Sequence, residues 1–277
     1  MKKVVTIQDI SCFGKCSATV ALPVISAMGV ECAVIPTAVL STHTGGFTGY
    51  TFRDLTDDIP AVTAHWKKEG LRFDGLYTGY LGSPEQAAMI GQFIDGIRPS
   101  YIFIDPAMAD NGKLYAGFGP EIVGAMKSLC DRADLIVPNL TEATLMLGEE
   151  YRAPGTYDEA YIRDILRRLA EGGAKIAAIT GVNYDGRQQG IVAYHRDSGE
   201  FEEYFHENLP VSYHGTGDLF AATLFGAIMR EKPLSDALRI AATNVLNAIR
   251  ATMDDPDYRY SVKFELCVPE LLAMLEE

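Results

Sequence analysis

Residues 157–180 read YDEAYIRDILRRLAEGGAKIAAIT and contain a helical pattern, a stop and an apolar run in direct succession. Within 157–171, apolar residues recur at the spacing of one helix face, and Gly172 and Gly173 follow, as glycines commonly do where a helix ends. Residues 175–180 are then almost continuously apolar, which is typical of a strand covered on both faces. This stretch therefore predicts the helix-to-strand unit of a parallel α/β sheet.

The same alternation of strand and helix extends over most of the chain. Further buried strands are predicted at 3–8, 30–39, 73–79, 101–105 and 134–137, and an antiparallel pair at the sheet edge is predicted at 189–196 and 201–206. Helices are predicted at 17–28, 84–97, 217–230, 234–251 and 267–276.

The helix at 84–97 has a recognisable start, in which Ser83 is the expected N-cap and Pro84 the first helical residue. Gln86 is the expected reciprocal partner of Ser83 in a capping box. The chain has no internal repeat, low-complexity tract or flexible linker. We therefore expect a single domain over 1–277, with a central, mostly parallel sheet flanked by helices on both faces.

The composition excludes several classes of protein. The chain has 277 residues, 24 Lys and Arg against 37 Asp and Glu, and a net charge of −13, which argues against binding a polyanion such as nucleic acid. No apolar stretch reaches the ~18 residues of a membrane span, and the N-terminus does not resemble a signal peptide. The 5 cysteines are scattered and odd in number, which favours free thiols and a cytoplasmic location.

Polar residues follow most of the predicted strands. In an open α/β sheet, ligands bind outside the carboxyl ends of the strands, so these positions are the candidates for a binding site. One polar residue after a strand is usually a cap or a turn, but a succession of them at the same sheet edge favours a site. They are Gln8-Asp9, Ser41 to Gly46, Gly79-Tyr80, Asp105 to Asp110, Asn139 to Glu142, and Thr180-Gly181.

The most specific local pattern is HGTGDLFAA at 214–222, in which a glycine pair opens an apolar helix with Asp218 in its first turn. Glycines allow close approach of the backbone to a phosphate, and the free N–H groups at a helix N-terminus bind anions. A capped helix start without a ligand explains the same residues equally well. The chain contains neither a P-loop motif nor a dinucleotide fingerprint.

At the level of longer segments the chain resembles the ribokinase-like small-molecule kinases, and among them the pyridoxal kinase branch. The segment GTGDLFAATL at 215–224 is similar to their C-terminal signature, and DPAMADNGKLY (105–115) and PNLTEATLM (138–146) are similar to further pyridoxal kinase segments. So are TIQDISCFG (6–14) and STHTGG (41–46). The resemblance implies ATP-dependent phosphorylation of the 5′-hydroxymethyl group of a vitamin B6 vitamer, with Mg²⁺, a monovalent cation as a further option, and commonly a homodimer.

The resemblance also implies roles for single residues. Asp218 matches the catalytic base, and the anion hole corresponds to Gly215, Thr216 and Gly217. The ATP side corresponds to Asp105, Asn139, Glu142 and Thr180, the magnesium ligands to Asp110 and Glu142, and the vitamer side to Asp9, Thr44, Gly45 and Tyr80. Carboxylates that hold Mg²⁺, a helix end that binds phosphate and one base are what phosphoryl transfer requires.

Two alternatives remain at this stage. Hydroxymethylpyrimidine kinases share the architecture but usually carry Cys at the position of Asp218, and a binding protein that has lost turnover would not need that base. The pyridoxal kinases commonly have Ser-His where this chain has Asp9-Ile10. His43 and His214 flank the expected site but are left out of the catalytic set, because an unpartnered histidine is more often structural.

Overall fold

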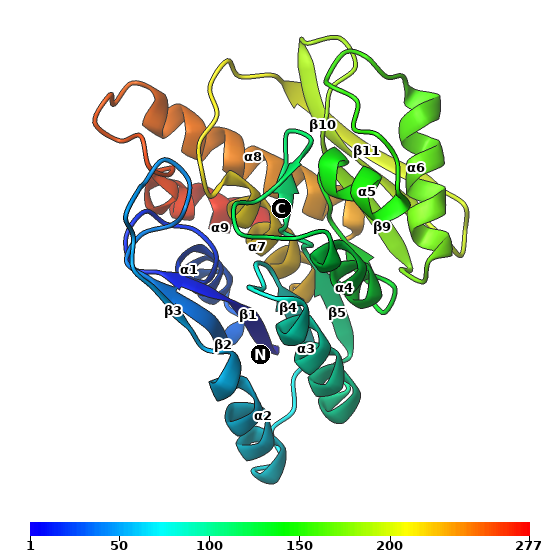
Figure 1. The fold of residues 1–277 in the computed structure, drawn as a ribbon. Coiled ribbons are helices and arrows are strands. Elements are labelled where there is room, and N and C mark those ends of the chain that lie inside the picture. Colours follow the sequence, from blue (N-terminus) through cyan, green and yellow to red (C-terminus); the bar gives the residue numbers. More distant parts are fainter.

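The computed structural model describes residues 1–277 and contains a nine-stranded sheet with helices on both faces (Figure 1). The strand order is β11-β10-β9-β8-β5-β4-β1-β2-β3. These strands are β1 (Lys3–Ser11), β2 (Glu31–Leu40), β3 (Phe52–Asp54), β4 (Gly75–Thr78), β5 (Tyr101–Ile104), β8 (Leu135–Ile136), β9 (Ile176–Val182), β10 (Gln188–His195) and β11 (Phe201–Glu207). A separate hairpin pairs β6 (Ala109–Asp110) with β7 (Lys113–Leu114).

The centre of the sheet is parallel, and the antiparallel pair predicted at 189–196 and 201–206 forms one of its edges. The strands from β2 through β1, β4, β5 and β8 to β9 are parallel, whereas β3 at one edge and β10 and β11 at the other are antiparallel. From β1 the chain first adds β2 on one side and later adds β4 on the other. Such a reversal opens a crevice at the carboxyl ends of the strands, where ligands bind in sheets of this kind.

Two layers of helices cover the sheet. The helices are α1 (Ala18–Ala27), α2 (Ile59–Lys68), α3 (Pro84–Ile97), α4 (Glu121–Cys130), α5 (Leu140–Leu147), α6 (Glu159–Glu171), α7 (Thr216–Met229), α8 (Leu234–Met253) and α9 (Val268–Glu276), with short 3-10 turns at Thr56–Asp58 and Phe264–Cys267. One face carries α3 to α6 and the other carries α1, α7, α8 and α9. None of these helices has both the length and the apolar character needed to cross a membrane.

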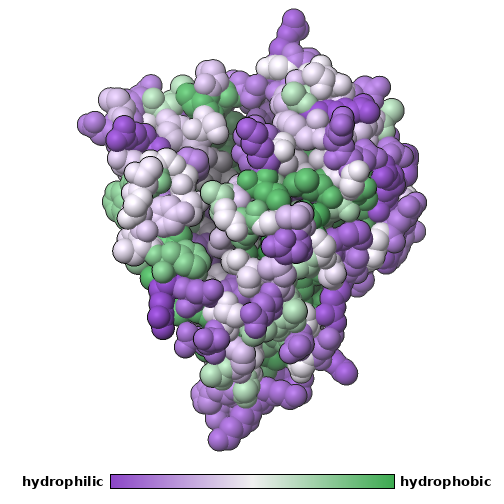
Figure 2. Space-filling view, in the orientation of Figure 1, coloured by the Kyte–Doolittle hydropathy of each residue, from purple (hydrophilic) through white to green (hydrophobic).

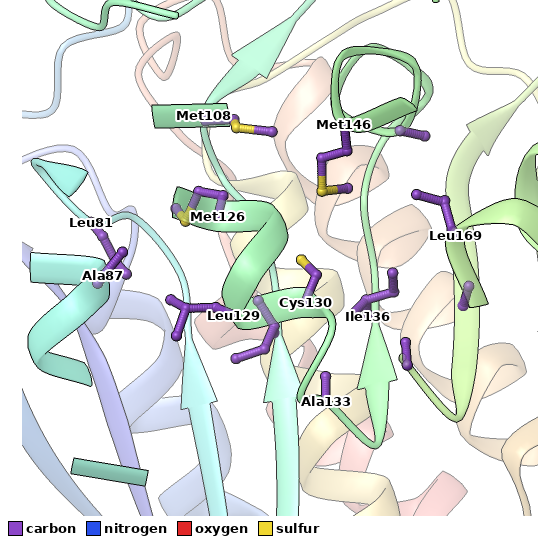
Figure 3. Packing of buried hydrophobic residues seen from close by; sticks show 14 of the residues in the cluster. Leu81, Ala87, Met108, Met126, Leu129, Cys130, Ala133, Ile136, Met146 and Leu169 are labelled. Carbon is purple, nitrogen blue, oxygen red and sulfur yellow. The ribbon is translucent and has the colours of Figure 1, made fainter. Parts of the chain in front are cut away.

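Each layer has its own buried core. On the first face, Met126, Leu129 and Cys130 of α4 lie over the strands, close to Ile136 of β8 (Figure 3). On the second face the aromatic rings of Tyr77 and Phe103 meet edge to face at 5.2 Å, and Phe225 of α7 lies 5.4 Å from Phe103. Burial on both faces explains why the central strands are almost continuously apolar.

Not every local expectation is confirmed. The hydroxyl of Ser83 caps α3 by accepting the Gln86 N–H at 3.2 Å, but the side chain of Gln86 does not return to Ser83. It accepts instead from Gly82 N–H at 2.7 Å and donates to the Thr37 carbonyl at 2.9 Å. The second half of the expected capping box is therefore wrong. The buried side-chain amide of Gln86 instead forms hydrogen bonds that connect the start of α3 to β2.

The short strand β3 and the helices α2, α4 and α5 were not predicted. Of the residues of α2, only Ile59 is buried, so no strong apolar face marks this helix in the sequence. The helix projects from one end of the molecule, and that end is mainly hydrophilic (Figures 1 and 2).

Candidate active site

A cavity of about 1090 Å³ lies at the carboxyl edge of the parallel strands. Its wall combines loops that follow the strands with the beginning of α7 and one side of α8. All of the residues proposed from the sequence for catalysis, anion, substrate, nucleotide and metal binding line it. They are Asp9, Thr44, Gly45, Tyr80, Asp105, Asp110, Asn139, Glu142, Thr180, Gly215, Thr216, Gly217 and Asp218.

Asp9 is a buried acidic residue of the cavity wall. It lies in β1, is 5% exposed, and accepts a hydrogen bond from the Ser11 hydroxyl at 3.0 Å. Burial raises the pKa of Asp9, and contacts with Ser17 and Ser11 counteract that rise. The nearby Tyr80 ring stacks on Phe118 with centroids 5.3 Å apart, and burial together with the Asp9 charge raises the pKa of Tyr80 to about 12.

Asn139 and Glu142 form a complete capping box at the start of α5. Asn139 Oδ1 accepts the Glu142 N–H at 3.0 Å, and Glu142 Oε2 accepts the Asn139 N–H at 2.9 Å. The other oxygen of Glu142 accepts the Met108 N–H at 3.1 Å, and the Asn139 side chain donates to the Ala109 carbonyl at 2.8 Å. The box therefore also fixes the loop that follows β5.

Glu142 of this box and two neighbouring acids, Asp105 and Asp110, form no ion pair with a Lys or Arg. Burial, with the negative charges of Glu142 and Asp218, raises the pKa of Asp105 well above its usual range, and burial also raises that of Glu142. Asp110 lies on the exposed hairpin, where it accepts the Asn111 N–H at 2.8 Å. Against these acids, Lys113 is the one Lys or Arg that lines the cavity.

This acidic set suits a divalent cation. The chain has no ready cluster of three side-chain metal ligands. Magnesium seldom requires one, because it commonly binds through one or two carboxylates and completes its shell with waters and substrate phosphates. Asp110 and Glu142, with Asp105 beside them, fit that mode of binding.

An anion site lies at the start of α7. Gly215 has a φ of 81°, and a side chain there would collide with the Lys15 carbonyl, so only glycine fits at this turn. The N–H groups of the first turn of α7 have no acceptor within the helix and carry the positive end of its dipole. Thr216 closes the turn by donating its hydroxyl to the Tyr213 carbonyl at 3.0 Å.

Asp218 stands on that same first turn, half-buried in the cavity wall. Burial and the negative charge of Asp9 raise its pKa to about 7, against the lowering effect of the Ser17 N–H. A carboxyl with a pKa near neutrality is suited to accept a proton at working pH. A proton acceptor beside an anion-binding helix end can serve phosphoryl transfer to a hydroxyl group.

Part of the cavity wall is apolar, and sequence reasoning missed it. Val211 comes from the loop before α7, Phe220 from α7, and Val245, Leu246 and Ile249 from α8. Their spacing on helices is indistinguishable from that of core residues. A flat apolar group fits between such side chains.

Several polar lining residues were also missing from the predicted set, among them Ser17, His43 and His214. His43 is 5% exposed, and its ring lies 5.2 Å from that of His214, centroid to centroid. The available signal was proximity in sequence, since His43 precedes Thr44 and His214 precedes Gly215.

Comparisons with known proteins agree with this geometry. Residues 20–262 match the family described as phosphomethylpyrimidine kinase. A pyridoxine/pyridoxal/pyridoxamine kinase of Bordetella bronchiseptica is 30% identical over 266 residues, which cover 91% of this chain and 89% of that protein.

Two solved structures are similar to this chain over nearly its whole length. One is a putative phosphomethylpyrimidine kinase from Bacteroides thetaiotaomicron, crystallised with pyridoxal (37% identity, TM-score 0.92, covering 98% of this chain and 95% of the other). The second is a pyridoxal kinase from Lactobacillus plantarum (33% identity, TM-score 0.92, covering 100% and 98%).

Proposed function

The chain belongs to the phosphomethylpyrimidine kinase family and is related throughout its length to pyridoxal kinases, and from this we infer that it is a pyridoxal kinase. It transfers the γ-phosphoryl group of ATP to the 5′-hydroxymethyl group of pyridoxal, pyridoxamine or pyridoxine. The observation that supports this most directly is the position of Asp218 on the first turn of α7, which joins a base of pKa about 7 to an anion site.

In the proposed reaction Asp218 accepts the proton of the attacking hydroxyl group. The backbone N–H groups of Gly215, Thr216 and Gly217 hold the transferring phosphoryl oxygens, where negative charge is greatest. Asp9, Thr44, Gly45 and Tyr80 surround the vitamer in the cavity.

The nucleotide takes the other part of the cavity. Asp105, Asn139, Glu142 and Thr180 line the phosphate side, and the apolar part of the wall receives the adenine ring. Asp110 and Glu142 would hold a magnesium ion, and the chemistry that this ion would supply is neutralisation of charge on the ATP phosphates. Lys113, the one Lys or Arg of the lining, would add a positive charge on this side of the cavity.

Further expectations belong to the same proposal. We propose that the chain acts as one domain over 1–277, that it works in the cytoplasm with its five free cysteines reduced, and that it forms a homodimer. A requirement for a monovalent cation is a further proposal, which a comparison of potassium with tetramethylammonium salts tests directly.

A coupled ATP-consumption assay tests the function. Purified protein is given ATP and Mg²⁺ with each of the three vitamers, with hydroxymethylpyrimidine and with a few sugars. The proposal predicts turnover of at least one vitamer, with its 5′-phosphate as product. Turnover of hydroxymethylpyrimidine alone establishes the alternative kinase, whose activity resembles the description of the matched family. Vitamer binding without ATP consumption establishes a non-catalytic binding protein.

A further inference from the structure

The helix α8 runs alongside the edge strand β11 and is joined to it at two points (Figure 1). The hydroxyl oxygen of Tyr204 lies 3.5 Å from that of Thr243, and Glu207 forms an ion pair with Arg250. Between the two contacts the strand advances by three residues and the helix by seven, which is about 10 Å along each. The strand and the helix therefore stay side by side over this length.

The stretch of α8 between the two contacts is part of the cavity wall. Leu246 and Ile249 of α8 line the cavity, and so does His206 of β11. Residues three and seven positions apart lie on one face of a helix, so Leu246 is on the same face of α8 as Thr243, which contacts β11. The cavity therefore extends between an apolar wall on α8 and a wall formed by the edge of the sheet.

The sheet side of this space carries a pair of polar side chains. Gln189 of β10 and His206 of β11 are direct partners in the antiparallel register, so their side chains lie next to each other on one face of the sheet. The next pair on that face, Ile191 and Tyr204, packs in the same core as α8. Gln189 and His206 both line the cavity, and we call the space between this pair and Leu246 the slot.

Both members of the pair have hydrogen-bonding capacity that the protein does not use. Nδ1 of His206 lies 2.8 Å from the Glu207 carbonyl oxygen, which can only accept, so Nδ1 carries a proton. In the neutral ring Nε2 is then an acceptor without a donor. The Gln189 carboxamide forms no hydrogen bond within the protein, and a Cβ atom on Gly181 would lie 3.8 Å from its Nε2. The carboxamide is therefore beside the backbone that follows Thr180.

The slot is continuous with the anion site. All residues from 208 to 218, which connect the end of β11 to the first turn of α7, line the same cavity. A ligand whose phosphates bind at that turn can therefore place a ring in the slot. An apolar wall on one side and a polar pair on the other suit a flat aromatic base with a polar edge.

The hydrogen-bonding pattern of the pair fits adenine better than guanine. A carboxamide forms two hydrogen bonds with the 6-amino group of adenine and the adjacent ring nitrogen, whereas the 6-oxo group of guanine is bound by Arg or Lys. Guanine would direct its oxygen at acceptor atoms, which costs binding free energy. The guanidinium of Arg250, at the end of the slot, is already paired with Glu207.

We propose that Gln189 and His206 recognise the base of the nucleotide and make this chain selective for ATP over GTP. This inference rests on the proposed kinase function and deepens it by assigning the choice of phosphoryl donor to two residues. Gln189 bonds the 6-amino group and the neighbouring ring nitrogen, and Nε2 of His206 accepts the second hydrogen of the amine. Leu246 packs against the face of the ring.

The test measures nucleotide binding without turnover. Competition with a fluorescent ADP analogue, in the absence of any vitamer, gives the Kd values of ADP, GDP and inosine diphosphate. Inosine diphosphate has the 6-oxo group of guanine without its 2-amino group, so it tests position 6 alone. The variants are Gln189→Leu and His206→Phe, which approximately keep the size of each side chain. Gln188→Leu is the matched control, because Gln188 is exposed, adjacent in sequence and outside the cavity.

The parent protein is expected to bind ADP ~10–100-fold more tightly than GDP or inosine diphosphate, the range for one bidentate contact to a base. Gln189→Leu and His206→Phe are each expected to weaken ADP binding by ~5–20-fold while the Kd values of the two 6-oxo nucleotides change by less than about threefold. Gln188→Leu is expected to leave all three Kd values unchanged. Thermal melts show that each variant is folded, and if one is not, the other decides.

Equal Kd values for ADP, GDP and inosine diphosphate in the parent overturn the inference. A folded variant that loses affinity for all three nucleotides by the same factor also overturns it, because the side chain then only shapes the cavity. A parent that selects ADP but phosphorylates no vitamer refutes the proposed kinase instead and leaves the inference standing.

Discussion

The Nε2 atom of His43 lies 2.6 Å from the backbone carbonyl oxygen of Tyr260, while Nδ1 of the same ring accepts the Gly45 N–H at 3.1 Å. Because Nδ1 accepts, the proton must be on Nε2, and the ring is neutral. Burial lowers the pKa of His43, and the proximity of His214 lowers it further. The imidazole thus ties the loop after β2 to the segment after α8, where the Tyr260 ring stacks on Phe47 at 4.3 Å.

His43→Ala removes this tie and should loosen the wall on the vitamer side. We expect the KM for the vitamer to rise by ~10-fold and Tm to fall, because Gly45 N–H and the Tyr260 carbonyl both lose a partner. The KM for ATP should stay within twofold. Steady-state kinetics on both substrates check this, with His65→Ala on exposed α2 as the control. Equal increases in the two KM values would contradict a local role.

Asp218→Asn should keep the fold and ligand binding while kcat falls by ~10²–10⁴-fold, the usual range for loss of a general base. In the parent, kcat/KM for the vitamer should rise with pH and level off above the pKa of about 7, because only the ionised carboxyl accepts a proton. The measurement is a pH series of initial rates. A variant that turns over within threefold of the parent shows that the base is a different group.

The stability of the ligand-free protein should decrease as pH rises. The pKa of Asp218 is raised from 3.8 to about 7, and those of Asp9, Asp105 and Glu142 are also raised. At pH values between the ordinary pKa of these carboxyl groups and their raised pKa in the folded protein, the folded protein binds more protons than the unfolded chain. The free energy of unfolding therefore falls with increasing pH in this range. Tm should therefore be lower at pH 8 than at pH 5.

Replacing one of these acids should flatten that dependence. Asp218→Asn is expected to be more stable than the parent at pH 8 by about 1–2 kcal/mol, or ~3–8 °C in Tm, after allowance for solvent screening. Thermal melts from pH 5 to pH 8 provide the comparison, with exposed Asp57→Asn as the control. Parallel curves for parent and Asp218→Asn are the result that would refute this explanation.

The two proposed magnesium ligands should differ in their side effects. Asp110→Asn should raise the Mg²⁺ concentration for half-maximal activity by ~3–10-fold without a change in Tm, since Asp110 is exposed. Glu142→Gln should raise it too, but with a lower Tm, because Glu142 also holds Met108 N–H and Asn139 N–H. Glu171→Gln on the surface of α6 is the control. If the magnesium titration is unchanged in both Asp110→Asn and Glu142→Gln, the two acids have only local structural roles in a turn or a helix cap.

Asp9 gives a prediction about the choice of vitamer. If its carboxylate pairs with the protonated amine of pyridoxamine, a charge-assisted hydrogen bond of roughly 1.5–3 kcal/mol favours that vitamer over pyridoxal by about tenfold or more. Asp9→Ser should then shift the ratio of kcat/KM toward pyridoxal. The hydrogen bond from Ser11 shows that Asp9 also has a local structural partner. Equal losses on both vitamers would assign it that structural role alone.

The sequence predicted the parts of this protein that depend on local patterns. The buried parallel strands, the Ser83 cap and the placing of all the proposed site residues at one sheet edge follow from apolar runs and from the residues just after them. The apolar part of the cavity wall could not be predicted, because Phe220 and Val245 are on helices where an apolar residue normally indicates core. The positive φ of Ser17 could not be predicted either, because serine rarely adopts it and no local pattern indicates it.

The helix layer formed by α1, α7, α8 and α9 also determines when one face of the sheet can be buried during synthesis of the chain. The apolar face formed by Val4, Tyr77 and Phe103 is covered largely by α7, α8 and α9, which are the last segments to be synthesised. Until the chain has passed residue 216, that face has few partners of its own, and parallel sheets form slowly in any case. A nascent or C-terminally truncated chain therefore exposes a large apolar surface, which only the final helices cover.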